Sequence, residues 1–208
     1  MIRKRLLVIL VLALSVHSIQ VNAAEEREPY DDRYCTTCHG TDGRGNYGVQ
    51  APRLAGMEAW YLKRQLENFR SGVRGTHPRD IEGIAMRPMA SKLSDESIAD
   101  IIDWVGSWEY IPTEVTIEGD ETAGAQLYAQ CASCHGQNAE GNEALGAPAL
   151  QGQNDWYLVT QLKNFKNGWR GAESGDAFGA QMIGMAQMLS DDDAINNVVS
   201  YINTLGRK

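Results

Sequence analysis

The chain has 208 residues, of which 43 % are hydrophobic, and its 27 acidic and 19 basic side chains give a formal net charge of −8. This length allows one large domain or two small ones. The negative charge disfavours a nucleic-acid partner and favours basic patches on partner proteins, unless it serves solubility alone.

Residues 1–24 have the pattern of a secretory signal peptide. Basic residues at 3–5 precede an apolar run at 6–16, and small residues at 21–24 fit a cleavage site. The run is shorter than the roughly 20 residues of a membrane span, although an uncleaved anchor with snorkelling basic residues is the alternative. We expect a periplasmic protein whose net charge becomes −11 when the three basic residues leave with the signal peptide.

From residue 35 onward the sequence repeats itself with a constant offset of 96 residues. Two such units match ordinary small domains, whereas a solenoid generally needs three or more. Pro112 and the β-branched, acidic stretch after it interrupt helical periodicity, so we predict domains at 25–110 and 120–208 joined by a linker at 111–119. The matched pairs include Cys35 and Cys131, Cys38 and Cys134, His39 and His135, Pro52 and Pro148, Trp60 and Trp156, Tyr61 and Tyr157, Arg74 and Arg170, Met86 and Met182, and Met89 and Met185.

The first unit is predicted to be helical after a weak start. Segment 25–32 is acidic and contains a proline, which disfavours an opening helix. Apolar and aromatic residues spaced by one, three or four predict a helix at 57–71. A glycine-rich loop follows, and a closing helix begins at Ser94, a good N-cap before acidic residues.

The second unit repeats this order with a clearer opening. Residues 122–129 form a plausible first helix, 153–167 match the central helix, and a closing helix is expected from Ser190. Strand signals are nearly absent from both units. The predicted fold class is therefore all-α.

Cys-Thr-Thr-Cys-His at 35–39 and Cys-Ala-Ser-Cys-His at 131–135 have the form of c-type haem attachment sites. Two thiols at this spacing can add to the two vinyl groups on one porphyrin edge, and the next residue carries an imidazole beneath the iron. Every cysteine of the chain is used in this way. The sequence predicts two covalent haem c groups, attached through Cys35, Cys38, Cys131 and Cys134 and ligated by His39 and His135.

Three other interpretations of the cysteines are weaker. A thioredoxin-like redox pair requires a strand–helix unit that the sequence does not suggest. A zinc site requires four ligands, and each unit offers three, unless the two units share one metal. Two disulfides would leave both histidines unexplained.

A low-spin haem needs a second axial ligand, for which methionine is the candidate that both units share. A thioether ligand raises the reduction potential. His77 cannot serve both units, because its counterpart is Glu173, and we expect it in an exposed loop. One methionine of each pair is predicted to ligate iron and the other to fill the core; the pairs are Met86 with Met89 and Met182 with Met185.

Other matched residues have two alternative roles each. Pro52 and Pro148 lie 13 residues after their histidines, and their carbonyls could accept the imidazole N–H, unless they are simple turn prolines. Arg74 and Arg170 could pair with haem propionates or lie solvated at the surface. The aromatic residues could line a haem edge or donate hydrogen bonds to the propionates, or they could simply fill the core; they are Trp60, Tyr61, Trp156 and Tyr157.

These residues together resemble class I dihaem cytochromes c, and most closely the cytochrome c4 family. The resemblance extends from about residue 30 to 205 and rests on the doubled haem motif, the Pro-X-Leu-X-Gly segments at 52–56 and 148–152, and a Met-X-X-Met segment before Leu-Ser-Asp. It implies two tandem cytochrome c domains, each wrapped around one covalent haem. In that family the first methionine of the segment is the ligand, which selects Met86 and Met182.

The resemblance further implies a one-electron carrier without catalytic residues. Its partners would be membrane-bound respiratory complexes, either an electron donor or a terminal oxidase. Peripheral association with the membrane is compatible with this role. A second hypothesis is a dihaem oxidoreductase of the peroxidase or thiosulfate dehydrogenase type, in which His77 would replace Met86. A third is an electron-accepting subunit of a larger complex.

Overall fold

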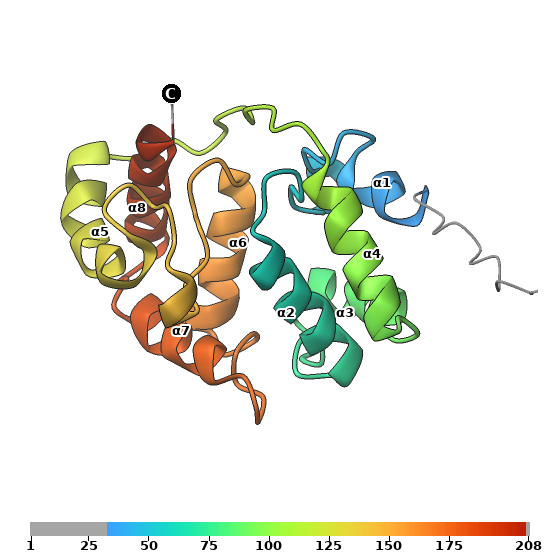
Figure 1. Cartoon of the computed structure of the whole chain (residues 1–208). Coiled ribbons are helices and arrows are strands. Elements are labelled where there is room, and N and C mark those ends of the chain that lie inside the picture. The colour runs from blue at the N-terminus through green and yellow to red at the C-terminus, as the bar shows by residue number, and fades with distance from the viewer. Residues whose placement is uncertain (1–32, 207–208) are drawn as a thin grey trace, which may run out of the picture.

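The computed structural model describes residues 33–206, which form two helical domains side by side, joined by an extended connection (Figure 1). The predicted signal peptide and segment 25–32 lie outside the described residues. Within the described part, the backbone forms two isolated β-bridges, Asn46 with Ala51 and Asn142 with Ala147, and no strand. The all-α prediction is confirmed.

The two domains repeat one order of elements. The first contains α1 (Arg33–His39), the 3₁₀ turn η1 (Tyr47–Val49), α2 (Ala59–Ser71), α3 (Ile81–Ala90) and α4 (Asp95–Gly106). The second contains α5 (Glu121–His135), η2 (Glu143–Leu145), α6 (Asp155–Lys166), α7 (Ala177–Gln187) and α8 (Asp192–Leu205). The helices predicted at 57–71 and 153–167 are α2 and α6, and the one predicted at 122–129 continues to the haem motif as α5.

The closing helices differ by one residue in how they begin. Ser94 caps α4 as predicted, because its hydroxyl accepts the Ser97 N–H at 3.1 Å. The prediction for Ser190 is wrong. Asp191 caps α8, with its carboxylate accepting the Ala194 N–H at 2.8 Å, while the Ser190 hydroxyl donates to that carboxylate. An acidic cap also interacts favourably with the helix dipole, which the serine does not.

Helices α3 and α7, which carry the paired methionines, were not predicted. Aspartates begin both: Asp80 accepts the Gly83 N–H at 3.3 Å, and Asp176 accepts the Gly179 N–H at 2.8 Å. The glycines weaken the helical pattern, and Pro88 lies inside α3. The space requires glycine, since a Cβ at Gly83 would lie 2.0 Å from the Asp80 carboxylate.

Each domain has a small apolar core of its own. In the first, the core lies between α2 and α4 and consists of Leu54, Leu62, Leu66, Ile98, Ile101 and Val105, with Met86 packed against it. In the second, α5, α6 and α8 surround a larger cluster centred on Ile195, Val198 and Val199. Cores of this size leave room for a large apolar group to complete each domain.

The extended connection is fastened to α6 by Asp155, which is 1 % exposed. Its carboxylate accepts the Thr116 N–H at 2.5 Å, the Thr116 hydroxyl at 2.7 Å and the Ile117 N–H at 2.8 Å. Burial acts to raise the pKa of this carboxyl, but the hydrogen bonds from Thr116 and Ile117 lower the pKa more, so that it lies below its ordinary value. The first unit has Ala59 at the matching position.

We expect Asp155→Ala to lower the free energy of unfolding by about 2–3 kcal/mol, because several partly buried donors lose a charged acceptor. Since the folded state lowers the pKa of Asp155, the difference from the parent should be full at neutral pH and shrink as the pH falls through about 4. Urea unfolding of the haem-loaded chain followed by circular dichroism measures both. The exposed Asp193→Ala is the matched control, expected within about 0.5 kcal/mol of the parent. Equal stability of the Asp155 variant would contradict this role.

Candidate functional site

Both haem motifs end a helix and direct a buried histidine inward. His39 ends α1 and His135 ends α5, and each side chain is 5 % exposed. The Nδ1 of His39 lies 2.6 Å from the Pro52 carbonyl oxygen, and that of His135 lies 2.7 Å from the Pro148 carbonyl oxygen. A carbonyl only accepts, so Nδ1 carries the proton and Nε2 is left to bind a metal. The predicted role of the two proline carbonyls as acceptors for the imidazole N–H is confirmed.

Burial keeps both imidazoles neutral. It lowers the pKa of His39 and of His135 below the ordinary histidine value, and the proline carbonyls offset this only in part. A neutral imidazole is the form that ligates iron. The two histidines are therefore held in the protonation state and orientation that a haem ligand requires.

A cavity lined mostly by the second domain, and also by first-domain residues such as Glu58, Tyr61 and Gln65, brings the remaining haem-binding groups together. The thiols of Cys131 and Cys134, which form no disulfide, share it with His135 and with the methionines Met182 and Met185 from α7. Its walls include the apolar side chains Leu150, Leu158, Leu162, Phe165, Val198 and Ile202. Two thiols, an imidazole and thioether sulfur in an apolar enclosure match the donor set of a haem c. The residues present fit the group that the motif predicts.

The first domain distinguishes its two methionines. Met86 is half-buried and packs against the domain core, whereas Met89 is 44 % exposed. Burial therefore supports Met86 as the inward-facing residue of α3. In the second domain, Met182 and Met185 are both half-buried and line the same cavity, so the choice of Met182 stays a prediction.

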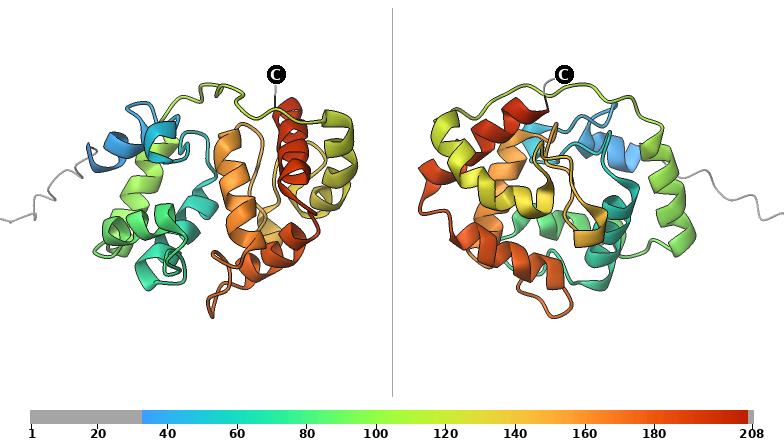
Figure 2. Two further views of the ribbon diagram at one scale, coloured as in Figure 1. Left: turned by 180° about the vertical axis from the view of Figure 1, so that it is seen from behind. Right: turned by 60° about the vertical axis from the view of Figure 1, so that its left-hand side comes forward.

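Arg74 is buried at the boundary between the domains, so its predicted alternative as a solvated arginine is wrong. Its guanidinium donates to Gln65 of its own domain at 2.6 Å. It also donates to the Tyr157 hydroxyl at 3.2 Å and to Gln161 at 3.1 Å, both on α6 of the other domain. In Figures 1 and 2, α2 and α6 face each other across this boundary.

Arg170 makes the reciprocal set of contacts. It donates to Gln161 at 2.7 Å, to the Tyr61 hydroxyl at 3.0 Å and to Gln65 at 2.9 Å. Among the described residues, the buried Nε atoms of Arg170 and Arg74 have no hydrogen-bond partner. Arg170 also lines the second-domain cavity. A buried cation with an unused donor favours an anionic partner, and haem propionates are of that kind.

The matched aromatic residues belong partly to this boundary. Tyr61 and Tyr157 supply the hydroxyls that accept from the arginines of the opposite domain. Trp156 is buried and meets the Tyr47 ring of the first domain edge-on, at 5.6 Å between centroids. Trp60 packs edge-on against Tyr61 at 5.7 Å. Tyr61 and Tyr157 also line the cavity that holds the haem-binding groups. None of the predicted roles, at a haem edge, at a propionate or in the core, included an interface between domains.

His77 is also part of the boundary. It is half-buried, and its ring stacks against Trp169 of the second domain with 6.3 Å between centroids and 15° between planes. His77 lies in a loop as predicted, but it is half-buried rather than exposed. Its neighbour Thr76 donates to Glu173 at 2.6 Å, so the two loops that precede α3 and α7 meet each other.

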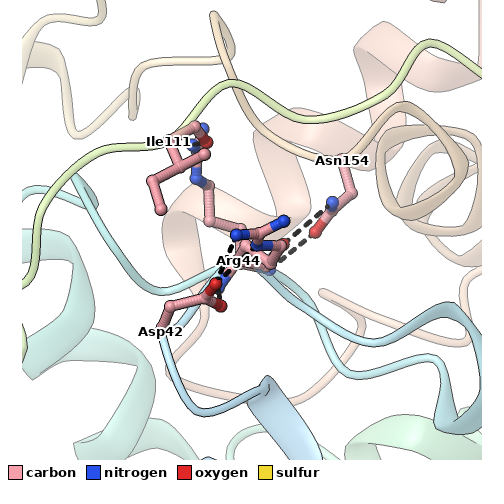
Figure 3. A network of polar contacts seen from close by, with 5 residues as sticks. Asp42, Arg44, Ile111 and Asn154 are labelled. Carbon is pink, nitrogen blue, oxygen red and sulfur yellow. Dashed lines mark hydrogen bonds and ion pairs between the residues drawn. The ribbon is translucent and has the colours of Figure 1, made fainter.

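A second group of contacts, around Asn154, joins the domains near the linker (Figure 3). The Asn154 amide donates to the Arg44 carbonyl at 3.2 Å and accepts the Arg53 N–H at 2.7 Å. The Arg53 guanidinium donates to the carbonyls of Gly152 and Ile111. None of these residues was assigned a role from sequence.

Two features are absent from residues 33–206. No three or more His, Cys, Asp or Glu side chains gather there as metal ligands. No helix in that range combines the length and apolar character needed to cross a bilayer.

Comparisons with known proteins agree with this geometry. The cytochrome c family model matches residues 27–109 and again residues 121–206. A cytochrome c4 from Stutzerimonas stutzeri is 32 % identical, over 97 % of this chain and 99 % of its own, and a thiosulfate dehydrogenase electron acceptor from Stutzerimonas stutzeri strain A1501 is 31 % identical over 92 % and 91 %. The crystal structure of reduced cytochrome c4 from Pseudomonas stutzeri superposes with a TM-score of 0.62 at 31 % identity, covering 81 % of this chain and 92 % of that one.

Proposed function

The chain belongs to the cytochrome c family as a dihaem electron carrier of the cytochrome c4 type, and on that premise we propose that it works in the periplasm, passing single electrons between respiratory complexes. The observation that carries the proposal is the pair of buried histidines, each fixed through Nδ1 by a proline carbonyl in matching domains. The periplasmic location rests on the predicted signal peptide. The acidic surface suits donors and acceptors with basic docking patches.

The protein's own residues would hold and enclose the two covalent haem c groups. We assign Cys35, Cys38, Cys131 and Cys134 to attachment, and His39, Met86, His135 and Met182 to the axial positions. The haem iron supplies a one-electron couple when bound. Ligation of each iron by an imidazole and a thioether would leave no coordination position open for a substrate, so the role of these residues would be to bind and orient the haem and to exclude water.

The location of His77 supports a carrier over a dihaem peroxidase or dehydrogenase. That alternative requires His77 to replace Met86, but the ring of His77 is stacked on Trp169 at the domain boundary. Met86, by contrast, packs on the core of its own domain.

One observation favours a more specific second role. The relative that is 31 % identical over 92 % of this chain carries the description thiosulfate dehydrogenase electron acceptor. We propose as second candidate that the chain accepts electrons from an enzyme that oxidises thiosulfate, and therefore acts as a subunit or close partner of that enzyme.

Spectroscopy and kinetics of the purified, haem-loaded protein test these roles. We expect a methionine-to-iron charge-transfer band from both ferric haems and no rapid cyanide binding; high-spin signal or fast cyanide binding would instead indicate an enzyme. Stopped-flow reduction by respiratory membranes and by a thiosulfate dehydrogenase then separates the two carrier roles. The faster donor identifies the physiological one, and reduction by neither would contradict both.

A further inference from the structure

Glu58 and Asn154 are matched residues that each reach into the opposite domain. They occupy the N-cap positions of α2 and α6, yet neither side chain caps its own helix. Glu58 Oε1 accepts the Ala149 N–H at 2.7 Å, and Asn154 Oδ1 accepts the Arg53 N–H at 2.7 Å. Both N-cap side chains therefore serve the neighbouring domain at equivalent places.

Each acceptor lies one peptide group away from a haem-binding histidine. The Ala149 N–H and the Pro148 carbonyl belong to the same peptide group, and that carbonyl accepts from Nδ1 of His135 at 2.7 Å. The Arg53 N–H and the Pro52 carbonyl likewise share one peptide group next to His39. Two continuous chains of hydrogen bonds result, each from a side-chain oxygen of one domain to the histidine of the other.

Glycines leave room for both chains. A Cβ at Gly45 would lie 2.4 Å from Asn154 Oδ1, and a Cβ at the matched Gly141 would lie 2.9 Å from Glu58 Oε1. Both glycines have positive φ, +92° and +84°, which other residues rarely adopt. In both domains, therefore, a glycine provides the space that the side chain from the opposite domain occupies.

The two chains of hydrogen bonds differ in the charge of the side chain at which they begin, a carboxylate at Glu58 and a neutral amide at Asn154. An oxygen that accepts from a peptide N–H polarises the peptide and makes its carbonyl a stronger acceptor, because linked hydrogen bonds reinforce one another. A carboxylate does this more strongly than a neutral amide. A stronger acceptor at Nδ1 increases the electron donation of the imidazole and stabilises ferric iron.

We propose that Glu58 and Asn154 are positioning residues, each of which tunes the haem potential of the opposite domain through the peptide group that it accepts from. Glu58 lowers the potential of the second haem more than Asn154 lowers that of the first. The inference rests on the proposed function, in which His39 and His135 ligate iron. The proposal gives a role to the difference between Glu58 and Asn154 at matched positions, which neither the haem motif nor the fold explains.

The test uses two variants of the haem-loaded full chain at neutral pH. Glu58→Gln keeps an acceptor oxygen but removes its charge, and should raise the ferrous-to-ferric ratio of one haem about tenfold at a fixed potential, or 59 mV for one electron. Asn154→Asp should shift the other haem in the opposite direction. A redox titration followed by the haem methyl signals in proton NMR resolves the two haems, and the ¹⁵N shift of the Ala149 amide reports on the hydrogen bond itself.

The control is Glu140→Gln, which removes a carboxylate adjacent to Gly141 that accepts from Asn138 rather than from Ala149. An equal potential shift in this control would attribute the effect to charge alone and overturn the proposal. The proposal also fails if both variants move the same haem, or if the Ala149 amide shifts while neither potential changes. Failure of the proposed function is separate, since the unmutated protein would then lack haem or the methionine band.

Discussion

Replacing Cys131 and Cys134 by alanine should leave one haem per chain instead of two. The second domain then lacks both thioether bonds, whereas Cys35 and Cys38 still attach the first haem. Because the cavity wall formed by α5, α6 and α7 depends on a group to enclose, we expect much of the second domain to unfold. Iron analysis and a pyridine haemochrome assay count the haems, and far-ultraviolet circular dichroism measures the helix lost.

Ser133→Ala is the matched control for this experiment. Ser133 lies between the two cysteines, is exposed, and donates to the Gln130 carbonyl at 2.8 Å. This variant should keep two haems and the parent helix content. Two haems per chain in the double cysteine variant would mean that thioether attachment in the second domain has been assigned wrongly.

Met182→Ala should keep the second haem attached but convert it from low spin toward high spin. On the proposed assignment, loss of the thioether removes the ligand that favours ferrous iron, so the potential of this haem should fall by at least about 59 mV, a tenfold change in its equilibrium. The methionine-to-iron band in the near infrared should halve, since the first haem keeps Met86. Redox titration and near-infrared absorption measure the two effects.

Met185→Ala supplies the comparison, because Met185 lies three residues along the same helix and lines the same cavity. It should retain the full band and a potential near that of the parent. If Met185→Ala loses the band while Met182→Ala keeps it, the two methionines exchange roles, and Met89 would then have to be tested in place of Met86.

Local spacing was sufficient to predict much of the fold and of each haem site. The apolar rhythm of α2 and α6 and the five-residue haem motifs are short-range features, so one sequence contains them in full. The contact of His135 with Pro148 was also foreseen, because a separation of 13 residues is spanned by a single loop. Helices α3 and α7 were missed, since Gly83 and Pro88 weaken the pattern while the caps that begin these helices are single aspartates.

The contacts at the domain boundary could not be predicted from local sequence patterns, because they join residues far apart in the chain. The bond from Arg74 to Tyr157 joins residues 83 positions apart, and that from Arg170 to Tyr61 joins residues 109 apart. The sequence of one unit alone does not decide whether each of these side chains lies at the surface or in the core of its own domain. The one available signal was a polar residue, Gln65, on the otherwise apolar face of a central helix.

The reciprocal contacts of Arg74 and Arg170 have the geometry of a two-fold dimer. Each unit alone carries a complete set of complementary groups, a tyrosine, a glutamine and an arginine, so identical subunits could associate through them as an isologous pair. Joining two such subunits in one chain makes the association permanent and allows the two copies to differ in sequence. Positions 58 and 154 can then hold different side chains, and two equivalent redox centres can become an ordered pair.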